Sequence, residues 1–311
     1  MIEAHGLTKR YGTSVAVNDL TFNVTSGAVT GFLGPNGSGK STTMRMIMGL
    51  DNPTSGSARV NGQRIAELKW PLRDVGALLD AKAFHPGRTA YNHLRWMAET
   101  NDIPRSRVDE MLELVGLTAV AQQRVKKYSL GMNQRLGIAA ALLGDPGVLL
   151  FDEPINGLDP EGIRWVRYLL RDLAAEGRTV FVSSHLITEM SLTADRLVVI
   201  GRGSLIAETS VDDFVAKNAD IAVRVVTPGR DAFTGVLREA GATATVEEDG
   251  AIVVSGMKAA AIGELAARKC FTLHELTPIS ASLEDAFMEL THDAVEFEAG
   301  RHLSAAGQTP A

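Results

Sequence analysis

The chain has 311 residues, which suffices for one large domain or for a large and a small one, each with its own core. Hydrophobic residues make up 45% and charged residues 22% of it, as is typical of globular proteins. The formal net charge of −6 gives no general attraction to nucleic acids, so no nucleic-acid partner is expected. Cys270 is the single cysteine, which excludes an internal disulfide, and we expect it to be buried as a small apolar side chain.

The chain also lacks the sequence features of secretion and membrane insertion. Its N-terminus does not have the basic and then apolar profile of a signal peptide. The best apolar run, residues 136–143, is too short to span a bilayer. We therefore expect the chain alone to be cytoplasmic, and any role at a membrane to depend on a partner.

Residues 34–41 (GPNGSGKS) match the P-loop pattern without a mismatch. The glycines allow consecutive N–H groups to hold phosphate oxygens, and the dipole of the next helix favours the same anion. Lys40 would reach the β- and γ-phosphates, and the Ser41 hydroxyl would bind Mg²⁺. A strand pattern at 28–33 and a helix pattern at 41–50 flank the loop, which favours a phosphate site over a chance glycine-rich turn. The residues predicted to bind the nucleotide here are Gly34, Pro35, Asn36, Gly37, Ser38, Gly39, Lys40, Ser41 and Thr42.

A second motif of phosphate chemistry follows a buried strand at 148–151. Asp152 would emerge at the end of this strand, where ligands collect in open α/β sheets, and would hold Mg²⁺ directly or through water. Glu153 would then accept a proton from the attacking water. An acidic turn after a strand is common elsewhere, but its place downstream of a complete P-loop favours the catalytic interpretation.

Alternating strand and helix patterns around these motifs indicate an α/β fold with a parallel central sheet. Asn61-Gly62 predicts a type I′ hairpin between strands at 57–60 and 63–65, so the early part should be a mixed sheet. The pattern turns helical from about residue 81 to residue 143. The sheet and its connecting helix then continue at 148–151, 163–173, 180–183, 197–200 and 205–206.

A second unit begins near residue 218. Its strand and helix patterns follow the order βαββαβ, with strands at 221–226 and 271–273 and a hairpin around Asp249-Gly250. Ser282 with Asp285 resembles a capping box that opens one more helix. This order suggests a small α+β sandwich of ferredoxin-like type. Residues 296–311 have the pattern of a disordered tail.

Three further motifs follow the P-loop in a fixed order, and with them the chain resembles the ATP-binding subunits of ABC transporters over nearly all of residues 1–215. The signature sequence falls at 128–132, the D-loop at 156–159, and the switch histidine is His185. Tyr11 matches the aromatic residue that stacks on adenine in that family. The resemblance implies an ABC-type P-loop fold for residues 1–217, with a helical subdomain at about 81–143. The second unit, at 218–295, is then a small α+β accessory domain.

The resemblance also implies how the motifs work together. In that family two copies close head to tail around two ATP molecules, so Ser129 and Gly131 would bind the nucleotide held by the partner, at the N-terminus of a helix. Asp159 would couple the two sites, and His185 would hydrogen-bond the γ-phosphate. The expected catalytic residues are Glu153, His185 and Lys40; the expected Mg²⁺ ligands are Ser41, Asp152 and Asp80.

Two departures from the family pattern stand out. Leu130 and Met132 occupy signature positions where Gly and Gln are usual, although Ser129 and Gly131 remain. Asp80 stands where the family has a Gln that senses Mg²⁺ and faces the membrane partner. Asp80 would still bind Mg²⁺, but it adds a negative charge on a shorter arm, which predicts altered coupling.

The variant signature and the added C-terminal unit resemble ATPase subunits of bacterial drug and antibiotic-resistance exporters. Such subunits pair with a separate membrane permease, for which the candidate contacts are Phe84, His85, Tyr91 and Trp96, although each is individually typical of a core residue. The chain would then act at the inner face of the membrane. An importer subunit would share every ATP-site motif. A soluble ABC protein acting on nucleic acid is disfavoured by the acidic charge and the absence of a long coiled coil.

Overall fold

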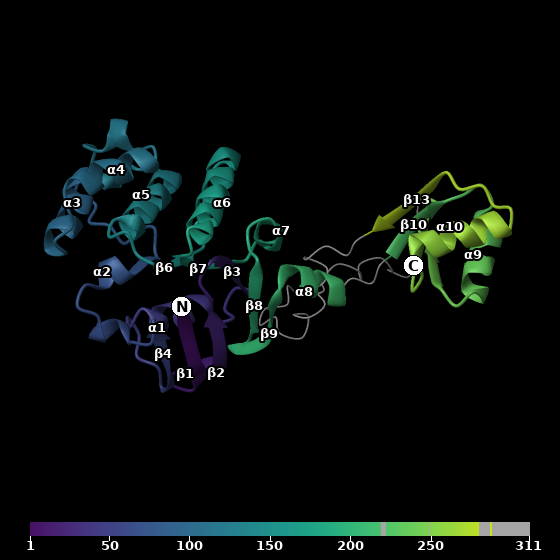
Figure 1. Cartoon of the computed structure of the whole chain (residues 1–311), viewed down its shortest axis with the longest axis horizontal. Helices are drawn as coiled ribbons and strands as arrows, with labels where there is room; N and C mark the ends of the chain where they lie inside the picture. Colours follow the sequence, from purple (N-terminus) through teal and green to yellow (C-terminus); the bar gives the residue numbers. More distant parts are fainter. Residues whose placement is uncertain (219–221, 248, 280–286, 288–311) are drawn as a thin grey trace, which may run out of the picture. The chain divides into compact units, whose positions relative to one another are not determined.

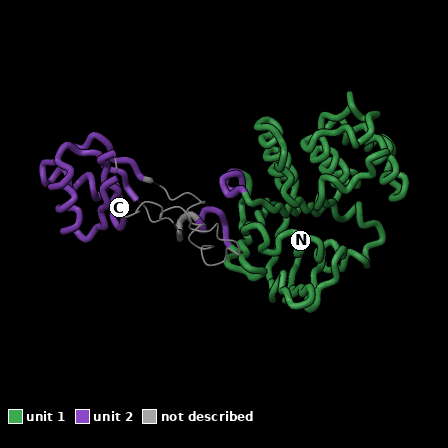
Figure 2. The backbone as a smooth tube through the Cα atoms, turned by 180° about the vertical axis from the view of Figure 1, so that it is seen from behind, with its two compact units in different colours: residues 1–185, 193–208, 290–311 green, residues 186–192, 209–289 purple. Residues whose placement is uncertain are grey.

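The computed structural model describes residues 1–218, 222–247, 249–279 and 287, and the chain divides into two compact units (Figure 2). The first unit comprises residues 1–185 and 193–208, and the second comprises 186–192 and 209–289 within the described ranges. The first unit ends at Glu208, whereas the sequence pattern suggested 217. Ser282, Asp285 and the tail predicted at 296–311 lie outside the described residues.

The first unit is built around a six-stranded sheet of order β5-β6-β7-β3-β8-β9 (Figure 1). The pairs β5–β6, β6–β7, β7–β3 and β3–β8 are parallel, which confirms the predicted parallel sheet. Strands β3, β6 and β7 are almost completely buried apolar runs, as expected of strands that are covered on both faces of a sheet. Their carboxyl ends therefore lie side by side. The strands are β3 (Ala28–Leu33), β5 (Val75–Leu78), β6 (Val148–Asp152), β7 (Thr179–Ser184), β8 (Arg196–Gly201) and β9 (Ser204–Ser210).

A three-stranded antiparallel sheet packs on this sheet. It contains β2 (Ser14–Val24), β1 (Ile2–Tyr11) and β4 (Ser55–Val60) in that order. Phe22 of β2 meets Phe32 and Phe181 of the parallel sheet, with ring centroids 5.6 and 5.5 Å away. These rings join the two sheets into one core with helix α1 (Lys40–Ile47).

The turn after β4 has the predicted type I′ geometry, but the strand predicted after it is wrong. Asn61 and Gly62 have φ values of 49° and 80°, as this turn requires. The chain then forms a 3₁₀ turn at Ile65–Glu67, where the Glu67 carboxylate accepts a hydrogen bond of 3.1 Å from the Arg64 N–H. This local capping contact replaces further strand pairing.

The helical region predicted at 81–143 is confirmed. It contains α3 (Ala90–Thr100), α4 (Ser106–Leu114) and α5 (Leu130–Leu142), with 3₁₀ turns at Thr118–Val120 and Val125–Lys127. Helix α5 is buried on nearly all sides. It lies against β5 and against α2 (Pro71–Asp74), the short helix directly before β5. A Cβ atom on Gly76 would overlap the Ala141 carbonyl oxygen, and one on Gly144 would overlap that of Leu72. Backbone therefore packs directly on backbone here.

Helix α6 (Pro160–Ala175) connects β6 to β7 and buries Val166, Leu170 and Leu173. It begins at Asp159, whose carboxylate accepts a hydrogen bond of 2.9 Å from the Gly162 N–H. Two further helices, α7 (Ile187–Ser191) and α8 (Val211–Asn218), belong to the second unit. No helix in the described part of the chain is both long and apolar enough to cross a membrane.

The remainder of the second unit is a βαββαβ sandwich, as its sequence predicts. Its four strands form an antiparallel sheet of order β11-β12-β10-β13. Phe233, Leu237 and Ile262 of the two helices form the core with this sheet. The elements are β10 (Ala222–Val226), α9 (Arg230–Glu239), β11 (Thr243–Val246), β12 (Ile252–Ser255), α10 (Ala259–Arg268) and β13 (Glu275–Ile279).

Two local predictions for this unit are wrong. The last strand lies at β13 rather than at 271–273, because Glu275 pairs with Val226 while Phe271 packs against the core as part of a loop. Cys270 is exposed, not buried. It adopts φ 56° directly after the end of α10, in the left-handed conformation that commonly terminates helices, and this geometry carries its side chain out of the core.

Candidate active site

The P-loop connects β3 to α1 at the carboxyl edge of the parallel sheet. Gly37 and Gly39 have φ values of 83° and 101°, which favour glycine. A Cβ atom on Gly39 would lie only 2.5 Å from the Ala16 carbonyl oxygen, so the loop also needs glycine for space. The loop borders a cavity of about 240 Å³. Its lining residues are Ala16, Asn36, Gly37, Gly39, Lys40, Ser41, Thr42 and Glu153.

The polar side chains of Ser38 and Lys40 in this loop are both buried. The Ser38 hydroxyl is buried and has no hydrogen-bond partner in the structure. The Lys40 ammonium donates to the carbonyl oxygens of Gly34 and Pro35, at 2.7 and 3.1 Å, within its own loop. Burial lowers the pKa of Lys40, and the nearby carboxylates of Glu153 and Asp152 oppose this shift. The buried Lys40 cation lines the cavity of the loop, and this arrangement fits a phosphate group.

The acidic pair lies where β6 and β7 end. The Ser183 hydroxyl donates to the Asp152 carboxylate and accepts a hydrogen bond of 3.0 Å from the Glu153 N–H. The Glu153 carboxylate is 2.8 Å from Nδ1 of His185. The structure thus brings the predicted residues Asp152, Glu153 and His185 together, and it places Glu153 in the same cavity as Lys40.

The predicted Mg²⁺ ligands do not form a preformed protein cage. No group of three or more His, Cys, Asp or Glu side chains suited to a metal occurs among the described residues. Ser41 and Asp152 with phosphate oxygens and water are a donor set that suits Mg²⁺, because this ion keeps several waters and needs few carboxylates. Asp80 lies in the exposed loop after β5, where its carboxylate accepts a hydrogen bond of 2.7 Å from the Lys82 N–H. Its role as a ligand stays a prediction.

The signature residues lie at the start of α5 and outside the P-loop cavity of their own chain. Ser129 is the N-cap of α5 and accepts a hydrogen bond of 3.2 Å from the Met132 N–H. A Cβ atom on Gly131 would lie 3.0 Å from the Gly157 carbonyl oxygen, so the signature packs directly on the D-loop. The Leu130 side chain occupies the space where a Gly157 side chain would be, and it remains 45% exposed.

Tyr11, the candidate adenine-stacking residue, ends strand β1. Its side chain is half exposed, and its hydroxyl lies 3.3 Å from the Asp51 carboxylate. The Lys9 ammonium lies 5.1 Å from the ring centroid. Tyr11 does not line the P-loop cavity, so an adenine-stacking role stays a prediction.

Sequence reasoning missed two residues of this site, Ser183 and Gln134. Ser183 bridges Asp152 and Glu153, as described above. The Gln134 side-chain amide donates a hydrogen bond of 3.0 Å to the main-chain carbonyl of Glu153. The available signal was Gln134 itself, a polar residue in the first half of a helix whose later residues, 136–142, are all apolar.

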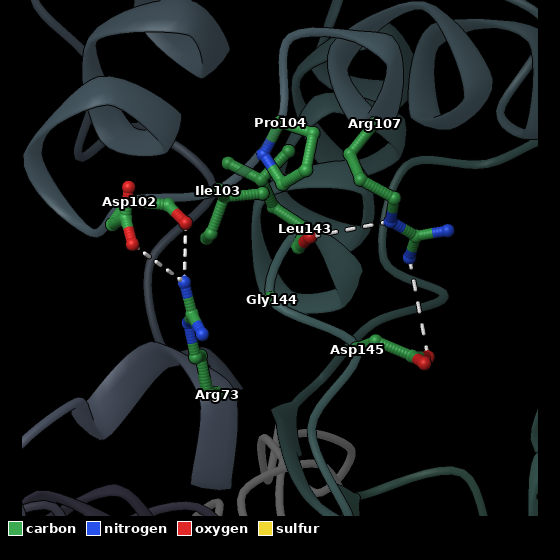
Figure 3. A pocket seen from close by; sticks show the side chains of 8 residues that line it. All are labelled: Arg73, Asp102, Ile103, Pro104, Arg107, Leu143, Gly144 and Asp145. Atoms are coloured by element: carbon green, nitrogen blue, oxygen red, sulfur yellow. Dashed lines mark hydrogen bonds and ion pairs between the residues drawn. The ribbon is translucent and has the colours of Figure 1, made fainter.

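A larger cavity, of about 390 Å³, lies away from the P-loop (Figure 3). On one side the Arg73 guanidinium donates to the carbonyl oxygens of Asn101 and Asp102. On the other the Arg107 guanidinium donates to the carbonyl of Leu142 at 3.1 Å. Arg73 thus ties α2 to the loop between α3 and α4, and Arg107 ties α4 to α5, so this cavity is a structural junction.

The candidate permease contacts lie in different surroundings. Phe84 packs edge-on against the buried His93, with ring centroids 4.8 Å apart. Trp96 is 51% exposed beneath the Arg88 guanidinium, 4.9 Å from its ring centroid. Tyr91 lines a separate cavity of about 480 Å³ with Leu112 and Ala121, and His85 is exposed.

A P-loop at the carboxyl edge of a parallel sheet, with a glutamate that directly follows β6 in the same cavity, defines a P-loop nucleoside triphosphatase. The comparisons with known proteins narrow this class. Residues 17–156 match the family model described as ABC transporter, and residues 221–284 match a domain of unknown function, DUF8746.

The chain is similar over nearly its whole length to the uncharacterized ABC transporter ATP-binding protein YhcH of Bacillus subtilis. The two are 38% identical over 303 residues, which cover 95% of this chain and 97% of that protein. It is 42% identical over 221 residues to the bacitracin transport ATP-binding protein BcrA of Bacillus licheniformis, covering 70% and 72% of the two chains. The chain belongs to the ABC transporter ATP-binding proteins, and it is an ATPase of this type, as the motifs predicted.

Solved structures agree with this assignment. The structure of an ATP-binding subunit of an ABC transporter matches with a TM-score of 0.64 at 27% identity, covering 70% of this chain and 92% of that one. The dimeric structure of MJ0796, a bacterial ABC transporter cassette, matches with a TM-score of 0.63 at 27% identity, covering 68% and 99%. The predicted α/β fold with a helical subdomain is therefore confirmed.

Proposed function

We propose that this ATPase powers a separate membrane permease that exports an antibiotic or a similar drug or lipid-like compound. The observation that carries the catalytic half of the proposal is the cavity in which Lys40 of the P-loop meets Glu153. The transport half is supported by relatives whose names are bacitracin transport and lantibiotic transport ATP-binding proteins. The chain would act at the inner face of the membrane, bound to its permease.

In this proposal each residue of the cavity has a defined task. Lys40 binds the β- and γ-phosphates, exchanging its bonds to the Gly34 and Pro35 carbonyls for phosphate oxygens. Ser41 and Asp152 hold Mg²⁺, which supplies charge neutralisation at the phosphates. Glu153 accepts a proton from the attacking water. His185 orients the Glu153 carboxylate through its 2.8 Å contact and reaches the γ-phosphate when ATP is bound.

The second half of each ATP site would come from another copy of the chain. Ser129 and Gly131 stand at a helix N-terminus suited to phosphate, yet they lie outside their own P-loop cavity. A head-to-tail homodimer would place them on the partner's ATP, with Asp159 at the junction. The dimeric form of the MJ0796 cassette supports this arrangement.

Two substitutions test the site. Glu153→Gln keeps the shape of the side chain but removes the base, so turnover should fall about 100-fold or more while ATP binding remains. Light scattering should then show a dimer with ATP and Mg²⁺. Lys40→Ala removes the phosphate cation and should weaken ATP binding by about 10-fold or more. Normal turnover by either variant would overturn the site assignment, and a monomeric Glu153→Gln protein would overturn the dimer.

Export is tested with the permease. The reading frame next to this gene should encode a membrane protein with about six spans, and no solute-binding protein. After reconstitution of both subunits in vesicles, bacitracin-like peptides should stimulate the ATPase. An importer, the second candidate, would instead require a binding protein for stimulation.

A further inference from the structure

We propose that Gln134 is a positioning residue for ATP hydrolysis, which holds the backbone of Glu153 from within the signature helix. Its side-chain amide donates a hydrogen bond of 3.0 Å to the Glu153 carbonyl. The contact joins α5, whose N-cap is the signature residue Ser129, to the loop that carries the catalytic carboxylate. The proposal rests on the assignment of Glu153 as the base.

The surroundings of Gln134 argue against a purely structural role. The side chain is only 4% exposed, and its carbonyl oxygen has no hydrogen-bond partner in the structure. A buried polar atom without a partner costs about 1–3 kcal/mol, so an apolar residue of the same length would stabilise the fold better. The donor contact to Glu153 is what this glutamine supplies and an apolar residue does not.

Glu153 needs external support because of its backbone conformation. Its φ of 51° lies in the left-handed region, which is costly for a residue with a side chain. The Ser183 hydroxyl accepts its N–H at 3.0 Å, and Gln134 holds its carbonyl. The Asn156 N–H donates to the same carbonyl at 3.2 Å, and the Glu153 N–H also reaches the Ser183 carbonyl at 3.3 Å. Together with these main-chain bonds, the two side-chain contacts hold both ends of the residue and thereby the direction in which the carboxylate leaves the backbone. An error of about 1 Å in such a group can cost 100-fold in rate.

The helix that carries Gln134 is itself held tightly. A Cβ on Gly137 would overlap the Leu78 side chain of β5, and one on Gly76 would overlap the Ala141 carbonyl. Because α5 fits against β5 without free space, Gln134 has a fixed position relative to the sheet. The same helix would carry any displacement at Ser129 to the Glu153 carbonyl. The signature of a subunit therefore acts on the carboxylate of that same subunit.

The test compares two variants of the full chain with the wild type. Gln134→Met keeps the length and burial but removes the donor, and kcat for ATP should fall about 10- to 100-fold, with less than about 3-fold change in ATP affinity. Gln134→Glu keeps the shape, and its ionised carboxylate cannot donate. Its kcat relative to the wild type should rise as the pH falls and the carboxyl group gains a proton, whereas the Met variant should show no such rise.

Two controls separate positioning from folding. Gln123→Met changes an exposed glutamine of the same helical region and should leave kcat unchanged. In the Glu153→Gln background, Gln134→Met should leave the ATP-bound dimer as stable as before, because no carboxylate remains to be positioned; a merely structural defect would weaken it.

The outcomes are distinct. Wild-type kcat in both Gln134 variants, or parallel loss of kcat, ATP affinity and dimer stability, would overturn the role of Gln134. If the Glu153→Gln single variant still hydrolyses ATP, Glu153 is not the base. The premise of this inference then fails.

Discussion

His93 is a buried base with an unsatisfied ring nitrogen. Its Nδ1 has no hydrogen-bond partner in the structure. The ring, carried by α3, contacts the rings of Phe84 and Trp96. Burial lowers the pKa of His93 to about 4, and the charge of Arg88 contributes to the shift. The neutral ring is therefore part of the folded state, since protonation would bury an uncompensated charge beside a guanidinium group.

This predicts an acid sensitivity that originates from one residue. The unfolded chain binds the proton near pH 6.5 and the folded chain only near pH 4, so the contribution of His93 to stability is complete above pH 6.5. It is lost as the pH falls from about 6.5 towards 4. His93→Leu should lose less Tm than the wild type over this range, measured by thermal unfolding at several pH values. Parallel curves for the two proteins would contradict the prediction.

Asp80 is the residue of the candidate site whose side chain differs most in chemistry from the Gln that the resemblance implies. It is exposed, and its carboxylate caps a turn through the Lys82 N–H. Asp80→Gln restores a longer neutral arm, so we expect the ATPase rate and its stimulation by the permease to change while ATP binding persists. Asp109→Asn, which removes an exposed charge on α4, is the matched control. Equal rates and equal stimulation for Asp80→Gln and wild type would disprove the expectation.

The residues of the site differ in how readily the sequence reveals them. The P-loop and the Asp152-Glu153 pair are short local patterns, because backbone cradles and strand-end carboxylates need neighbouring residues. The contacts of Ser183 and Gln134 are different. They depend on the packing of β7 and α5 next to the end of β6. This tertiary arrangement cannot be predicted from a local sequence pattern.

At the scale of elements, helix α5 and strand β5 pack without room for a side chain at Gly76. Because Gly76 lies against the Ala141 carbonyl, even a methyl group should force the helix away from the strand. Gly76→Ala should therefore lower the free energy of unfolding by about 1–3 kcal/mol. It should also reduce ATPase activity, since α5 carries both Ser129 and Gln134.

Gly147→Ala provides the control for this prediction. Gly147 has open space around the position of a Cβ atom, in the loop before β6. This substitution should be neutral or stabilise by up to about 1 kcal/mol. Urea unfolding of both variants measures the difference, and equal stabilities would show that the helix tolerates the displacement.

The sequence predicts the boundary of an element where one residue type fixes the backbone conformation. It does not predict a strand boundary that is set by hydrogen bonding to a partner strand. The Asn61-Gly62 turn has its expected geometry because both residues tolerate positive φ. The strand expected after it is replaced by a 3₁₀ turn, and β13 begins at Glu275 because β10 offers its partners there. Neither the 3₁₀ turn nor the start of β13 can be predicted from the periodicity of apolar residues alone.

At the scale of the whole molecule, the two units have separate cores. The cluster that includes Phe22 and Phe32 belongs to the first unit, and the cluster that includes Phe233 and Ile262 belongs to the second. The two clusters share no residue. Separate cores of this kind favour separate unfolding of the two parts of the chain.

We therefore expect two transitions in calorimetry of the full chain. ATP with Mg²⁺ should raise the transition temperature of the first unit only, because a ligand stabilises the state that binds it. At 100 times Kd, its free energy of unfolding should increase by about 2.7 kcal/mol. The Lys40→Ala protein should show the same two transitions without the shift. A single transition, or a shift of both by ATP, would mean that the units unfold cooperatively.

The contact between Leu130 and Gly157 couples the signature to the D-loop within one chain. Leu130 replaces a small residue of the signature and fills the space beside Gly157, which itself has a positive φ of 75°. A side chain at 157 would therefore need a strained backbone and a displaced Leu130 side chain. Because the two residues share this space, we expect the stability effects of substitutions at 130 and 157 to be non-additive in a double-mutant cycle.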